Sequence, residues 1–173
     1  VETDTPGDLP LLELHAETAY TVIAKRSDDP SIQSARETFT TDPLPADFPP
    51  IALTVPATMD VQPGITVMAA VEWIQPSAMH SNFLIAVDED GRVVWYHRLH
   101  GLNIGLHIDE SRRIYTTQSA TQTLRVDPFG QQTTEWNAED LGLDTTHHAI
   151  RPLPDDGLAM LSTELREVPG WYD

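Results

Sequence analysis

Two adjacent histidines, His147 and His148, are the residues of this sequence best suited to chemistry. A histidine side chain can donate or accept a proton near neutral pH. Arg151 and Arg166 follow along the chain, and a guanidinium group binds oxyanions through several N–H donors. The simpler alternative is an exposed pair of loop histidines, with arginines that form ordinary surface ion pairs.

The elements that must position these residues are predicted to be short antiparallel strands. Residues 83–87 and 92–96 are β-prone and are joined by the turn-forming stretch Asp88–Gly91. The same pattern recurs over 123–136, where Val-Asp and Gly return 39 positions later (127 − 88 = 39), although the Trp comes two positions late. A third partial unit begins at Thr146. A period near 40 is typical of β-propeller blades, and two unrelated hairpins of a β-sandwich are the alternative.

In a propeller, the histidine pair precedes the innermost strand of a blade, near the mouth of the central channel. Adjacent residues of an extended chain point to opposite faces, so we expect only one of the two to face the mouth. We favour His148, because it is nearer the strand that begins around Ile150.

The first 42 residues have a different character. Leu14-x-Ala16-x-Thr18-x-Tyr20 resembles the tyrosine corner of fibronectin type III domains, in which the Tyr hydroxyl satisfies a backbone group. We therefore predict an all-β chain: the end of a fibronectin-III-like β-sandwich at 1–42, a Pro-rich linker at 43–50, and the first blades of a β-propeller at 51–173. Both ends indicate a piece of a longer protein.

Charge is the strongest compositional signal. Twenty-seven acidic residues against ten basic ones give a net charge of −17, which disfavours binding to nucleic acid or to an anionic membrane surface. The acidic surface either keeps the protein soluble or reflects adaptation to high salt. No apolar run is long enough to span a membrane, and the absence of Cys excludes disulfides and thiol chemistry.

A metal site is not predicted. His97, His100 and His107 could supply imidazole ligands, but they fall on separate strands and no carboxylate pattern accompanies them. The stretch Asp88–Gly91 lacks the later ligands of a calcium loop. We expect no metal and no cofactor.

Three stretches together resemble bacterial arylsulfotransferases: the Phe39–Pro45 segment, the pattern from Val87 to Trp95, and His147-His148 ahead of Leu153–Leu158. In that family a β-sandwich precedes a six-bladed propeller. The resemblance implies transfer of a sulfuryl group from an aryl sulfate to a phenol through a sulfated histidine, without a nucleotide sulfate donor. Ala149 departs from the pattern, because the family commonly has an acid after the paired histidines.

The resemblance also implies roles for the residues named first. His147 and His148 become catalytic candidates, and Arg151 and Arg166 become substrate-binding candidates. Because the family's sulfated histidine lies late in the propeller, it would fall beyond Asp173, and this chain alone would be inactive. His148 would then donate a hydrogen bond to the sulfuryl or phenolic oxygen.

The resemblance implies a periplasmic or extracellular protein whose partners are an aryl sulfate and a phenol. The alternative is a non-catalytic extracellular module that binds protein or glycan, as a homo-oligomer or as part of a protein assembly. Further histidines and arginines at the channel mouth would favour the enzyme.

Overall fold

The computed structural model describes residues 10–55, 63–70, 82–101, 105–164, 166–167 and 169–170. Over these residues the predicted all-β class is confirmed, since the regular elements are strands and two short 3-10 helices. Neither helix is long enough to cross a membrane. The chain divides into two compact units, 1–66 with 86–95 and 67–85 with 96–173, and each is described by itself.

The first unit contains a hairpin of β1 (Ala19–Val22) and β2 (Glu37–Thr40). Tyr20 lies opposite Phe39 in the register, and their rings stack with centroids 5.8 Å apart. The Tyr20 hydroxyl accepts a hydrogen bond from the backbone N–H of His15 at 2.8 Å. The hydrogen bond that the tyrosine-corner pattern predicted is therefore confirmed.

A three-stranded sheet follows, with β3 (Thr66–Ala70), β4 (Asn82–Val87) and β5 (Val93–Leu99) in the order β3-β4-β5. Every residue of β4 is buried, which fits its continuous apolar sequence from Phe83 onward. Side chains cover both faces of this strand, so alternation of polar and apolar residues is not needed there.

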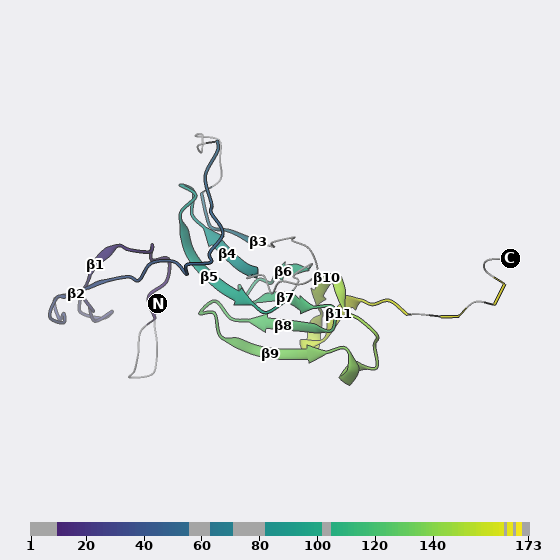
Figure 1. The fold of residues 1–173 in the computed structure, drawn as a ribbon. Coiled ribbons are helices and arrows are strands. Elements are labelled where there is room, and N and C mark those ends of the chain that lie inside the picture. The colour runs from purple at the N-terminus through teal and green to yellow at the C-terminus, as the bar shows by residue number, and fades with distance from the viewer. Residues whose placement is uncertain are drawn as a thin grey trace. The chain divides into compact units, whose positions relative to one another are not determined.

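The second unit holds a four-stranded antiparallel sheet in sequence order (Figure 1). Its strands are β6 (Leu106–Ile108), β7 (Ile114–Ser119), β8 (Gln122–Val126) and β9 (Gln132–Asn137), followed by the 3-10 helix η1 (Glu139–Leu141). A two-stranded sheet of β10 (His147–Pro152) and β11 (Leu158–Leu161) comes next, with the 3-10 helix η2 (Pro154–Asp156) in its connection.

The predicted repeat of the hairpin turn is confirmed. Asp88 and Asp127 each accept the N–H of a glycine three residues later at 3.0 Å, and Gly91 and Gly130 have φ angles of +76° and +81°. The Asp88 side chain also caps its own turn, because Oδ1 accepts the N–H of Arg92 at 2.9 Å. Glycine suits both positions because positive φ costs it little.

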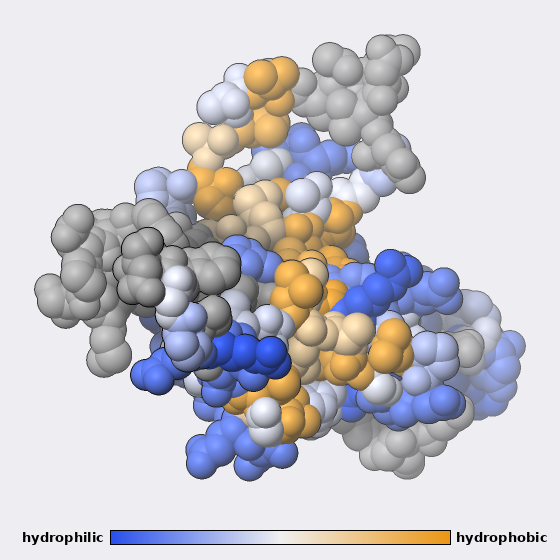
Figure 2. Space-filling view, turned by 90° about the vertical axis from the view of Figure 1, so that its right-hand side faces the viewer, coloured by the Kyte–Doolittle hydropathy of each residue, from blue (hydrophilic) through white to orange (hydrophobic). Residues whose placement is uncertain are grey.

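The core of the second unit includes four threonines that are fully buried. Thr116, Thr117 and Thr123 lie on β7 and β8, and Thr146 precedes β10. Buried apolar residues, such as Ile114 on β7, are neighbours of these threonines along the chain. Apolar side chains also gather on one face of the molecule between hydrophilic ones, as Figure 2 shows.

Candidate functional site

Both histidines of the predicted site lie at the start of β10. His147 is opposite Leu161 and Ile150 is opposite Met160, so β10 advances three residues where β11 advances one. His148 is within this bulge, is exposed, and has a φ angle of +61°. Left-handed backbone is uncommon for a residue other than glycine, and bulges and such strained residues are enriched at functional sites.

The bulge removes the regular geometry from which one inward and one outward histidine were expected. That expectation assumed a regular strand, in which successive side chains alternate. The two additional residues and the left-handed His148 interrupt the alternation. That His148 faces the channel mouth stays a prediction. The direction of its side chain is set by the bulge.

Gly105 lies against the backbone of His148. A Cβ atom at Gly105 would collide with the His148 carbonyl oxygen, which belongs to the backbone and cannot rotate away. Gly105 is itself fixed by β7, because its N–H donates to Thr117 Oγ1 at 3.1 Å and its carbonyl accepts from Thr116 Oγ1 at 3.0 Å. Gly105, Thr116 and Thr117 therefore support the backbone of His148, and none of the three was predicted from the sequence.

The backbone before the histidines is also tethered on two sides. The N–H of Thr146 donates to the Ala120 carbonyl at 2.7 Å, and the Thr123 hydroxyl lies 3.4 Å from that of Thr146. The Thr145 hydroxyl accepts the N–H of Thr163 at 3.1 Å, beyond the end of β11. Contacts on both sides therefore hold the segment that enters the bulge.

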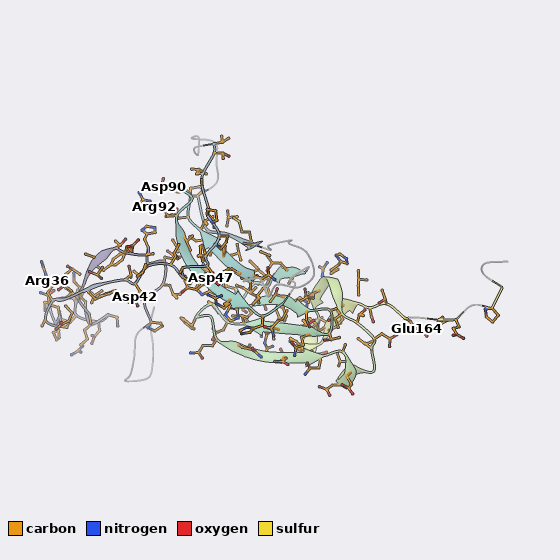
Figure 3. The ribbon with its side chains drawn as sticks, viewed as in Figure 1. Arg36, Asp42, Asp47, Asp90, Arg92 and Glu164 are labelled. Atoms are coloured by element: carbon orange, nitrogen blue, oxygen red, sulfur yellow. The ribbon has the colours of Figure 1, made fainter. Side chains whose placement is uncertain are left out.

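The two arginines have different surroundings. Arg151 lies in β10 opposite Ala159, is exposed, and is three residues from His148. Arg166 pairs with Glu164 at 2.6 Å, and that carboxylate raises the pKa of Arg166. Glu164 lies on the segment beyond β11 (Figure 3). Arg166 thus forms the surface ion pair of the simpler alternative, and its role in anion binding stays a prediction.

The histidines considered as metal ligands are spread over two strands and a loop. His97, in β5, is half-buried, and burial lowers its pKa, while a backbone contact with Gly130 raises it and nearby His100 lowers it. The His107 ring lies 6.3 Å from that of Tyr115. Within the described part of the chain, no three His, Asp or Glu side chains gather as a metal site.

Comparison with known families now adds to this geometry. The family described as Arylsulfotransferase (ASST) matches residues 54–169, which include every strand from β3 to β11 and the histidine pair. No curated protein and no solved structure matches the chain. Because the family covers well over half of the sequence, the chain belongs to the arylsulfotransferase family. The resemblance noted from the sequence is confirmed.

Proposed function

We propose that this chain is part of an enzyme that moves a sulfuryl group from an aryl sulfate to a phenol, with a histidine carrying the group between them. The observation that carries the proposal is the family match, which includes His147 and the exposed, left-handed His148. The proposed location is periplasmic or extracellular. Fractionation of cells that produce the protein tests the location, and recovery with cytoplasmic markers would contradict it.

We further propose that residues 51–173 form the first blades of a β-propeller, after a partial β-sandwich at 1–42 and a linker at 43–50. Three successive sheets support the propeller, as do the equivalent turns after β4 and β8. Val87 and Val126 belong to different sheets, which agrees with separate blades. The Tyr20 hydrogen bond supports the partial sandwich.

The proposed reaction has two steps. In the first, a histidine nitrogen forms a bond to sulfur, the bond between sulfur and the aryl oxygen breaks, and the departing phenolate takes a proton. In the second, the acceptor phenol loses its proton, its oxygen bonds to sulfur, and the sulfur–nitrogen bond breaks. Both steps need donors for the sulfuryl oxygens, the first also needs an acid that protonates the departing phenolate, and the second needs a base that takes the acceptor's proton.

The chain's own residues would serve the oxygens in this scheme. His148 would donate a hydrogen bond to the sulfuryl or phenolic oxygen, while another histidine carries the covalent group. Arg151 and Arg166 would bind sulfuryl oxygens, because guanidinium groups pair well with such anions. A donor held by a tethered backbone is already in position, which is what transition-state stabilisation requires.

Single substitutions of the two histidines test the proposal. In the protein that carries this sequence, His148→Ala is expected to lower turnover of a chromogenic aryl sulfate by roughly a hundredfold, since removal of one such donor typically has that effect. His147→Ala is expected to have a milder effect. Far-UV circular dichroism checks that both variants fold. Wild-type rates in both variants would exclude the pair from the reaction.

A further inference from the structure

Arg113, just before β7, and Arg125, in the neighbouring strand β8, direct their side chains at the same carboxylate oxygen. Arg113 Nη1 lies 3.8 Å from Asp156 Oδ1, and Arg125 Nη1 lies 3.6 Å from that same atom. Both distances exceed the roughly 3.2 Å limit of a good N–H···O hydrogen bond. The Asp156 side chain is 80% exposed, so this carboxylate is held loosely by two cations.

Other contacts fix both guanidinium groups. Arg113 Nε donates to Asp109 Oδ2 at 2.7 Å, and Arg125 Nε donates to Thr133 Oγ1 at 3.0 Å. Arg125 also lies over the ring of Trp136, 6.0 Å from its centre. Because the Nε groups are occupied in this way, the two side chains stay in place while their Nη1 groups converge.

The turn that carries Asp156 is strained. Asp155 and Asp156 have φ angles of +68° and +58°, and both belong to η2, between β10 and β11. Consecutive left-handed residues other than glycine cost conformational energy. A weak, exposed contact does not hold such a turn firmly, so another anion can compete with Asp156 for the two arginines.

This site is separate from the histidine pair. His148 is near the beginning of β10, whereas Asp156 follows the end of the same strand. The ends of β10 lie opposite Leu161 and Leu158 of β11, three residues apart, so at about 3.3 Å per residue they are roughly 10 Å apart. Binding at the arginines therefore does not depend on the proposed sulfuryl-transfer site.

We propose that Arg113 and Arg125 form a binding site for a small tetrahedral oxyanion such as sulfate, and that Asp156 is its intramolecular competitor. A tetrahedral anion offers several oxygens and accepts hydrogen bonds from both Nη1 groups at once. The single oxygen of Asp156 is too distant to accept a good hydrogen bond from either. Two of the chain's ten basic residues meet here, on a protein whose net charge is −17.

Titration with sodium sulfate, followed by the NMR signals of the arginine Nε–H groups and the Trp136 indole N–H, tests the site. Sodium chloride keeps the ionic strength constant, because exposed charges are screened by salt. We expect saturable shifts at Arg113 and Arg125. Arg125→Gln should abolish saturation, and circular dichroism reports whether that variant folds.

The turn offers a matched pair of variants that does not risk the fold of the sheet. Asp156→Asn should tighten sulfate binding by roughly two- to fivefold, the size of an exposed ion pair's effect. Asp155→Asn, next to it in the same strained turn, should leave the affinity unchanged. Shifts that grow linearly, saturation that survives in folded Arg125→Gln, or equal affinities in the two turn variants would overturn the proposal. His148→Ala should not alter this titration.

Discussion

Gly105 lies in contact with the backbone of His148. Its missing side chain leaves room for the His148 carbonyl oxygen, and no rearrangement of a flexible side chain can relieve a collision between a Cβ atom and backbone. Gly105→Ala is therefore expected to destabilise the protein by about 1–3 kcal/mol, as overpacking does, or to displace the bulge. Urea unfolding measures the stability, and the His148 imidazole NMR signals report the displacement.

Gly157→Ala is the matched control for that change, because Gly157 lies in the β10–β11 hairpin that carries His148. A Cβ atom there would meet its nearest neighbour, Leu153 Cβ, at an ordinary 3.4 Å, and its φ angle of −69° suits any residue. Equal effects of the two substitutions would show that Gly105 has no particular role beside His148.

The sequence identified the histidine pair, because residue type and spacing are visible in it. It could not identify the left-handed backbone of His148, because that conformation depends on how β10 pairs with β11. The contact with Gly105 comes from a different part of the chain, and no local pattern encodes it. Gly105 just before the apolar residues Leu106 and Ile108 was the available signal.

The turn between β6 and β7 shows how an aspartate stabilises a hairpin without glycine. Asp109 Oδ1 accepts the N–H of Arg113 at 2.9 Å, and Arg112 takes the left-handed position with a φ angle of +61°. The turns at Asp88 and Asp127 were predicted from their glycines. The same backbone pairing in the Asp109 turn was not predicted, because Arg112 occupies the glycine's place.

Asp109 also makes stability depend on pH. Desolvation opposes its ionisation, but hydrogen bonds from the Arg113 N–H and guanidinium and from the Tyr115 hydroxyl outweigh this and lower its pKa. A lowered folded-state pKa gives stability that is present above the unfolded pKa of about 3.9 and is lost as pH falls through the folded value. The protein should therefore lose stability below about pH 4.

Asp109→Asn tests this contribution, since an amide oxygen can still accept the backbone N–H. The variant should be about 1–2 kcal/mol less stable than the wild type at neutral pH, and the difference should shrink below about pH 4. Urea unfolding across this range measures both effects. Glu110→Gln, at an exposed position of the same turn, should change stability little at neutral pH. A difference that stays constant with pH would exclude the titration of Asp109 as its cause.

At the scale of the whole molecule, the sequence predicted the all-β class and the family. The turn pattern that repeats after 39 residues corresponds to hairpins in two different sheets. Trp136 comes two positions later than the repeat predicts, and the structure explains one of them. β9 has one additional residue where Arg125 pairs with Thr134 and Val126 pairs with Gln132. The buried threonines and the arginine pair were not predicted, because burial and convergence depend on how neighbouring strands pair, which residue type and spacing do not show.

The net charge of −17 leads to a prediction for the whole chain. Like charges repel over about 30 Å at 0.01 M salt but over only about 3 Å at 1 M. The melting temperature should therefore rise steadily from low to molar sodium chloride. The double variant Glu89→Gln with Asp90→Asn removes two exposed charges from one turn, where Figure 3 marks Asp90 beside Arg92. It should melt higher than the wild type at low salt and gain less from added salt. A flat or falling series for the wild type would mean that surface repulsion does not limit its stability.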